Sequence, residues 1–138
     1  MRGRTDQGGG VDRGARHDYW GVVLEAPDAG ALADFYAGLL GWQVHSREPG
    51  FATIAPPDGV AYLGFQTSAS YVRPVWPARP NSQAITMHLD FEVDDLTAAV
   101  GHARELGAEL AGHQPQAGVR VLLDPAGHPF CLYVDQVT

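Results

Sequence analysis

The apolar residues of the chain form a short strand pattern followed by a helical one. Residues 19–24 are a β-rich apolar run, which predicts a strand. The next stretch, 29–40, carries large apolar side chains at helical spacing: Leu32, Phe35, Tyr36, Leu39 and Leu40. Asp28 stands where a helix N-cap is expected, and Gly41 stands where a left-handed residue ends a helix. The pattern therefore predicts a capped helix over 29–40.

Three short strands are predicted after this helix. They cover about 42–46, 51–55 and 61–66, and turn residues at 49–50 and 56–59 separate them. A linker is predicted over 67–83, because this stretch holds three prolines. A disordered leader is predicted over 1–17, where no hydrophobic periodicity is found.

The same order of elements restarts after the linker. An alternating strand is predicted over 85–93, and Asp94 and Asp95 precede a second Ala-rich helix over 96–106, which Gly107 should end. Further strands are predicted near 109–112, 119–123 and 130–134. Each half has the order βαβββ, so the pattern predicts one α+β domain over 18–138. Module one covers 18–66 and module two covers 84–136.

Length and composition are those of one ordinary soluble domain. The chain has 138 residues, of which 45% are hydrophobic. No apolar run approaches the roughly 20 residues that a membrane-spanning helix needs. The single cysteine cannot form an internal disulfide, and no apolar signal segment is visible. We therefore expect a cytoplasmic protein.

The charge distribution argues against nucleic acid and membrane partners. The formal net charge is −7, and four of the nine arginines lie in the first 18 residues with three acids. The rest of the chain has five arginines against 13 acids. An acidic body of this kind repels phosphate backbones and anionic lipid. Nucleotide-hydrolysis, zinc-finger and serine-hydrolase functions are also disfavoured, because their phosphate loop, CxxC, HExxH and GxSxG motifs are missing.

Three segments together resemble a known family: 33–42, 88–95 and 124–130. In this order and at these separations they resemble the vicinal oxygen chelate superfamily, the glyoxalase/bleomycin-resistance type of protein. The resemblance covers about 19–136. It implies two βαβββ modules that form an open, curved mixed sheet with the helices outside. It also implies a cavity for a small-molecule ligand, and a homodimer.

The resemblance further implies four inward metal ligands in the members that use a metal. His88 matches the ligand on the first strand of module two, whereas Gly21 at the matching place in module one has no side chain. Cys131 stands where a Glu is usual on the last strand of module two. The last strand of module one is ambiguous among Leu63, Gly64 and Gln66. A tightly bound divalent metal is therefore disfavoured, and His88 is its one matching ligand.

Strand alternation adds a second candidate to the site. If His88 faces the cavity, Asp90 and Glu92 share its face, while the apolar residues between them face the helix. His88 and Asp90 are our candidate catalytic pair, a general base and its partner, and hydrogen bonding to a polar ligand is the alternative. For Glu92 we favour a position on the solvated rim.

The remaining candidates concern ligand binding. Gln66, Trp76 and Cys131 are the candidate ligand-binding residues, with Trp76 as a lid over the cavity mouth. Cys131 is also open to interpretation as a nucleophile, a soft metal ligand or inert packing, and we favour packing. Four residues are candidates for an aromatic pocket, namely Trp42, Tyr62, Phe65 and Trp76, although for Trp42 we favour a place in the core.

Two functions stay open at this stage. One is a lyase- or isomerase-type enzyme for a small polar molecule, with a degenerate metal site. The other is a non-catalytic small-molecule binding protein of the bleomycin-resistance type, and a paralogue that has lost activity is a third possibility. One scaffold serves many functions, so the fold cannot decide between them.

Overall fold

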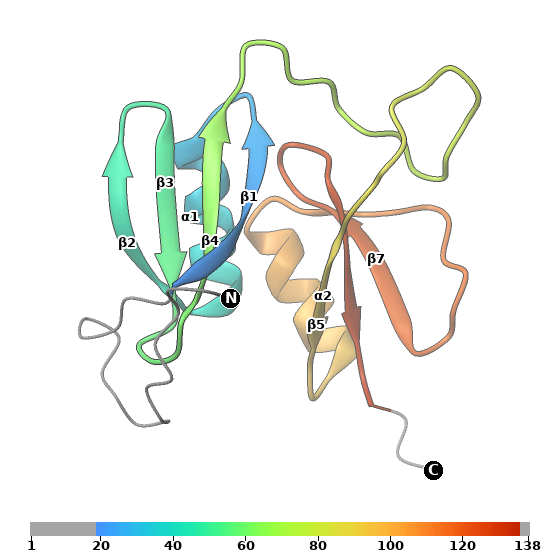
Figure 1. Cartoon of the computed structure of the whole chain (residues 1–138). Coiled ribbons are helices and arrows are strands. Elements are labelled where there is room, and N and C mark those ends of the chain that lie inside the picture. The colour runs from blue at the N-terminus through green and yellow to red at the C-terminus, as the bar shows by residue number, and fades with distance from the viewer. Residues whose placement is uncertain (1–18, 136–138) are drawn as a thin grey trace, which may run out of the picture. The chain divides into compact units, whose positions relative to one another are not determined.

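A computed structural model describes residues 19–135. The chain divides between Ala69 and Ser70 into two compact units, and each has the predicted order of one strand, one helix and three strands (Figure 1). The α+β fold class predicted from the sequence is confirmed. The predicted leader, 1–17, lies outside the described residues. Within 19–135, neither helix has the length and apolar character needed to cross a membrane.

The first unit is a four-stranded mixed sheet with one helix on one face (Figure 1). The strand order is β1-β4-β3-β2, in which β1 runs parallel to β4 and the other pairs are antiparallel. The elements of this unit are β1 (Trp20–Ala26), α1 (Ala29–Leu40), β2 (Gln43–Glu48), β3 (Phe51–Ala55) and β4 (Ala61–Thr67).

Local sequence signals fix both ends of α1. The Asp28 carboxylate accepts a hydrogen bond of 3.1 Å from the Ala31 N–H, and Gly41 ends the helix with φ 68°. The helix packs its apolar stripe on the sheet, where the rings of Tyr36 and Phe65 stack at 5.7 Å between centroids. Both side chains are fully buried. The helix therefore covers one face of this sheet, and the opposite face is called the open face below.

The second unit repeats this topology with shorter elements. Its strand order is β5-β8-β7-β6, with β5 parallel to β8. The elements are β5 (Leu89–Glu92), α2 (Leu96–Glu105), β6 (Glu109–Leu110), β7 (Val119–Leu123) and β8 (Pro129–Tyr133). The strand predicted over 85–93 is thus only four residues long. Shorter strands leave more of this unit's backbone in loops.

The two ends of α2 differ in how well the sequence predicted them. Asp95 is the N-cap, and its carboxylate accepts a 2.9 Å hydrogen bond from the Ala98 N–H. The helix ends one residue earlier than predicted, because Leu106 is the C-cap in a right-handed conformation. Gly107 takes the positive φ of 112° one step later. The N–H groups of Gly107 and Ala108 donate to the carbonyl oxygens of Arg104 and Ala103 at 3.1 and 3.0 Å, so this glycine does end α2, one position beyond the C-cap.

The sheet of the second unit also has two different faces. Phe130, Leu132 and Leu122 are fully buried, and Phe91 meets Phe130 edge to face at 6.3 Å between centroids. Directly paired residues of neighbouring strands point to the same side of a sheet. Asp90 is paired with Cys131, so both side chains lie on the face opposite these buried residues, which is the open face of this sheet. This register builds the site described next.

Candidate functional site

His88 and Asp90 are in contact at the start of β5. Their exposure follows the predicted alternation, since His88 and Asp90 are exposed whereas Leu89 between them is half-buried. The Nε2 atom of His88 lies 3.2 Å from Oδ1 of Asp90. The side chains are 43% and 56% exposed, so a molecule arriving from solvent can reach both. The two predicted catalytic residues therefore form a pair on the open face.

Cys131 completes a group of three donors with this pair. The ligand atoms of His88, Asp90 and Cys131 all lie within 4.8 Å of one another. Cys131 is half-buried, and its thiol hydrogen-bonds to the Asp90 carboxylate. Burial, and then the negative charge of Asp90, raise the pKa of the thiol to about 11. The thiol is therefore protonated at neutral pH, and it is a poor nucleophile in this state.

The other predicted ligand-binding residues lie elsewhere. Gln66 is exposed on the open face of the first unit, where it pairs with Glu25 and Phe51. The Nε1–H group of Trp76 donates to the carbonyl oxygen of His113 at 3.3 Å, and the two rings are 5.8 Å apart. Trp76 is thus held against the loop that precedes β7. Gln66 thus belongs to the first unit and Trp76 to the second.

The open face of the first unit carries a small pocket that the sequence did not predict. It has a volume of about 220 Å³ and a polar floor, where Ser46 Oγ and Thr53 Oγ1 lie 2.7 Å apart. Its lining residues are Tyr19, His45, Ser46, Thr53 and Tyr62. Of the aromatic candidates on β4, Tyr62 lines this pocket, whereas Phe65 points to the helix side and is fully buried. The alternation of β4 explains this difference, since 62 and 65 lie an odd number of residues apart.

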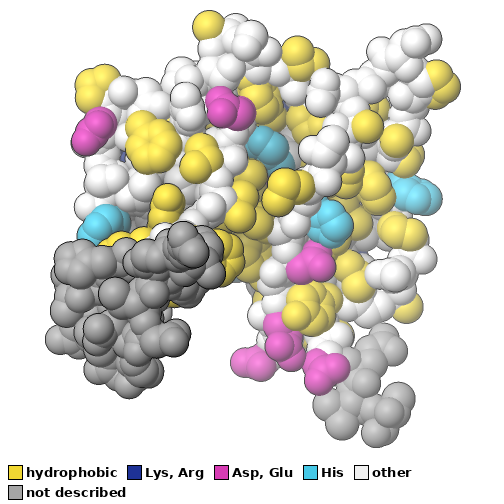
Figure 2. Space-filling view, viewed as in Figure 1, with side chains coloured by type: hydrophobic (Ala, Val, Ile, Leu, Met, Phe, Trp, Pro, Cys, Tyr) yellow, Lys and Arg dark blue, Asp and Glu magenta, His cyan; other side chains and the backbone are white. Residues whose placement is uncertain are grey.

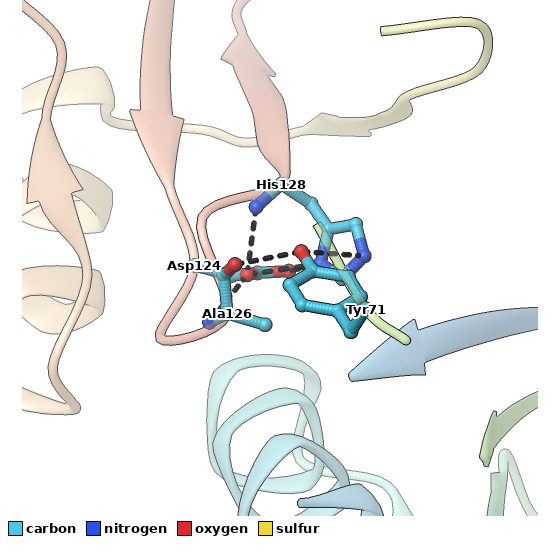
Figure 3. A network of polar contacts seen from close by, with 4 residues as sticks. All are labelled: Tyr71, Asp124, Ala126 and His128. Carbon is cyan, nitrogen blue, oxygen red and sulfur yellow. Dashed lines mark hydrogen bonds and ion pairs between the residues drawn. The ribbon is translucent and has the colours of Figure 1, made fainter. Parts of the chain in front are cut away.

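A buried polar network joins the start of the second unit to the β7–β8 turn (Figure 3). Asp124 is 2% exposed, and its carboxylate accepts from the N–H groups of Ala126 and His128 at 2.9 and 3.0 Å. Nδ1 of His128 lies 2.8 Å from Oδ2 of the same carboxylate. The Tyr71 hydroxyl donates to the Ala126 carbonyl oxygen at 2.6 Å.

The sequence analysis used 124–130 only for the family resemblance, so this network was not predicted and Tyr71 was not a candidate. Burial, and then the charge of Asp124, raise the pKa of Tyr71 to about 12. These hydrogen bonds lie within the turn or reach into it from Tyr71, so the network stabilises local structure. The signal that could have found it is the Asp-Pro-Ala-Gly-His sequence, in which an Asp side chain satisfies the turn's own N–H groups.

The described surface is acidic, as the sequence predicted. Figure 2 shows acidic side chains on the visible face and scarcely any lysine or arginine. Residues 19–135 contain 13 acids and five arginines. The field around the candidate site therefore favours neutral or cationic molecules over anionic ones.

A family profile decides where the chain belongs. The profile of the glyoxalase-like domain matches residues 21–133. The chain belongs to this family. The superfamily predicted from the three sequence segments is thereby confirmed. No curated protein is similar enough in sequence to be counted as a relative.

Solved structures of glyoxalase-like proteins share the fold. A glyoxalase/bleomycin resistance protein/dioxygenase family enzyme from Burkholderia phytofirmans PsJN is 22% identical, with a TM-score of 0.63, and the match covers 83% of this chain and 95% of that one. A glyoxalase-related enzyme from Fulvimarina pelagi is 20% identical (TM-score 0.61; 88% and 91% covered). The fosfomycin resistance protein FosX from Mesorhizobium loti is 13% identical (TM-score 0.59; 86% and 92% covered). These similarities are to the fold.

The four-ligand metal set that the glyoxalase-like fold implies does not fit the first unit. At Gly21, a Cβ atom would lie 2.6 Å from the ring of Tyr62, so this ring fills the place where a ligand side chain would project. At Gly64, a Cβ atom would lie 3.3 Å from the ring of Phe51. Leu63 is buried on the helix side. Of the matching positions in this unit, only that of Gln66 offers a polar side chain on the open face, and it is an amide.

Proposed function

We propose that this glyoxalase-like chain is an enzyme of the lyase or isomerase type that acts on a small polar molecule by proton transfer. His88 is the general base in this proposal, and Asp90 is its partner. The observation that carries the proposal is the 3.2 Å contact between His88 Nε2 and Asp90 Oδ1 on an exposed face. A base must lie within hydrogen-bonding reach of the proton that it removes, and this face leaves that approach open.

The division of labour follows from the chemistry of the two groups. The Asp90 carboxylate contacts the imidazole of His88, so it can hold the ring in place while His88 removes a proton. His88 then returns the proton to a different atom of the same molecule, which is an isomerisation, or to a leaving group, which is an elimination. The neutral Cys131 thiol donates a hydrogen bond to Asp90 on the same face of the sheet. No step of this scheme uses a metal.

A proton-exchange measurement tests the proposal directly. Metal-free protein is incubated in D₂O with a panel of small 2-oxo and 2-hydroxy carbonyl compounds, and NMR follows exchange of the carbon-bound hydrogen next to the carbonyl. For a compound that the wild type exchanges or converts, His88→Ala should reduce the rate about 100-fold or more, and Asp90→Asn should cause a smaller loss. His102→Ala is the matched control, because it removes an exposed histidine from α2. Equal rates for His88→Ala and wild type would exclude His88 as the base.

A second candidate function is favoured by the pocket in the first unit. Two tyrosines, a histidine and a hydroxyl pair line a space of about 220 Å³, which suits retention of a small polar or aromatic molecule. A non-catalytic binding protein of the bleomycin-resistance type would use such a pocket without chemistry. Native mass spectrometry separates the two functions, because a binding protein retains an unaltered ligand whereas an enzyme releases a changed product.

We also propose that the working form is a homodimer. Exposed apolar side chains at the start of β1 support this, since Tyr19 and Val23 share one face and are 40% and 41% exposed. Light scattering coupled to size-exclusion chromatography gives the molar mass in solution. A mass of one chain at micromolar concentration would contradict the dimer.

A further inference from the structure

We propose that His88, Asp90 and Cys131 form a binding site for a soft divalent cation of the zinc class, contained within the second unit. These residues offer an imidazole nitrogen, a carboxylate oxygen and a thiol sulfur, and their ligand atoms lie within 4.8 Å of one another. This combination of nitrogen, oxygen and sulfur donors suits zinc, whereas magnesium, calcium and manganese prefer oxygen donors. Three protein ligands leave a fourth tetrahedral position for water or another small molecule.

The distances require only small side-chain movements. Ligand atoms around a tetrahedral zinc ion are about 3.4–3.7 Å apart, as follows from bond lengths near 2.0–2.3 Å. His88 Nε2 and Asp90 Oδ1 are already 3.2 Å apart. The ligand atoms are at most 4.8 Å apart, which exceeds the required separation by no more than about 1.4 Å, and side-chain rotations can supply this difference. The backbone positions of Asp90 and Cys131 are held next to each other, because these residues are partners in the β5–β8 ladder.

This site differs from the metal set that the fold implies in three ways. All its ligands come from one unit, whereas the implied set takes half its ligands from the other. Tyr62 covers Gly21 at one of those missing positions. Asp90, two residues after His88, supplies the carboxylate that the usual ligand positions lack, and a thiol replaces an oxygen donor. The change in donor set moves the preferred metal from hard cations toward soft ones.

A cation at this site has a consequence for the proposed function. It would hold the Nε2 atom of His88 and the Asp90 carboxylate, so His88 could no longer act as a base. Zinc would therefore inhibit proton transfer, and this consequence rests on the proposed function. The binding itself rests only on the geometry of the three donors.

Cobalt titration of metal-free full-length protein tests the binding. Co²⁺ replaces Zn²⁺ in tetrahedral sites and absorbs light in the near ultraviolet when a thiolate binds to it. Because the chain has one cysteine, such a band can arise only from Cys131. We expect a stoichiometric band that excess Zn²⁺ removes. Cys131→Ser should abolish it, and His88→Ala and Asp90→Asn should each weaken cobalt binding by about tenfold or more.

Matched controls keep the outcome decisive. His102→Ala and Glu92→Gln remove an exposed imidazole and an exposed carboxylate outside the group, and both should bind cobalt as the wild type does. Circular dichroism confirms folding of each variant. Absence of the band in the folded wild type would overturn the proposal, and so would a band unaffected by His88→Ala and Asp90→Asn. The titration contains no substrate and the exchange measurement contains no metal, so failure of one proposal leaves the other to its own test.

Discussion

Asp90 and Cys131 are directly paired across the parallel strands β5 and β8, and the thiol of one hydrogen-bonds to the carboxylate of the other. The two residues lie 41 positions apart in the sequence, yet Asp90 adds to the effect of burial in raising the pKa of the thiol, and Asp90 also contacts His88. The three side chains on the open face of the second unit therefore influence one another. Changing one of them should alter the pKa or the reactivity of another.

The first prediction concerns the reactivity of the Cys131 thiol in metal-free protein. Iodoacetamide reacts with the thiolate, so its rate should keep rising toward pH 11, whereas an ordinary thiol levels off near its pKa of 9. Asp90→Asn removes the negative charge and should move the midpoint to lower pH. Burial is the larger cause and persists, so the midpoint should stay above 9. Mass spectrometry of the alkylated chain gives the rates.

Glu92→Gln is the control for this measurement. Glu92 is an exposed acid on the same strand and face as Asp90, but its partner in the ladder is Tyr133 rather than Cys131. Its removal should leave the alkylation profile where it is in the wild type. A wild-type midpoint near 9 would show that neither burial nor Asp90 acts on the thiol.

The sequence predicted the modules because their signals are local. Asp28 and Asp95 cap their helices through N–H groups three residues ahead, and Gly41 supplies a left-handed backbone at the helix end. Such interactions involve few neighbouring residues, so the residue types are sufficient evidence. The alternation that put His88 and Asp90 on one face is equally local.

The rest of the site depends on pairings between distant strands. A shift of one residue between β5 and β8 would turn Cys131 away from Asp90, and nothing within either strand states the register. The ring of Tyr62 over Gly21 arises in the same way from the β1–β4 ladder. The sequence therefore put His88 and Asp90 on one face, but the contact of Cys131 with Asp90 follows only from the pairing of the two strands.

The Tyr71 hydroxyl is predicted to stabilise the second unit. Tyr71→Phe removes the 2.6 Å hydrogen bond to the Ala126 carbonyl oxygen, and we expect the free energy of unfolding to fall by about 1 kcal/mol. Tyr62→Phe is the control, because no hydrogen bond of the Tyr62 hydroxyl is seen in the described structure. Urea denaturation at pH 7 measures both. An equal effect of the two substitutions would show that the network does not contribute.

The pKa of Tyr71 predicts a specific loss of stability in alkali. The folded chain keeps this phenol protonated up to about pH 12, whereas the unfolded chain loses the proton near pH 10. The stabilising contribution is therefore complete below pH 10 and is lost as the pH rises from 10 through 12. The stability difference between wild type and Tyr71→Phe should shrink over that interval. A difference that stays constant to pH 12 would contradict the raised pKa.

Asp124 is predicted to be the residue of this network that matters most for stability. Asp124→Ala leaves the N–H groups of Ala126 and His128 without their acceptor in a buried turn, and should cost about 2–4 kcal/mol. Asp124→Asn keeps one oxygen acceptor and should cost less. Asp58→Ala provides the control, since Asp58 is an exposed residue in the turn between β3 and β4. Thermal unfolding followed by circular dichroism should show the largest loss of stability for Asp124→Ala, a smaller loss for Asp124→Asn and the smallest for Asp58→Ala.

Two glycine substitutions are predicted to have opposite effects. At Gly21, a Cβ atom would lie 2.6 Å from both the ring and the carbonyl oxygen of Tyr62, so Gly21→Ala must displace β4 and should cost about 1–3 kcal/mol. Gly101 is exposed within α2 and has no atom within 4 Å of its Cβ position, so Gly101→Ala should stabilise the chain by about 0.5–1 kcal/mol. Urea denaturation of both variants measures the two effects against the wild type. If Gly21→Ala were as stable as the wild type, the Tyr62 ring could move aside, and the argument that it excludes a ligand side chain at this position would fail.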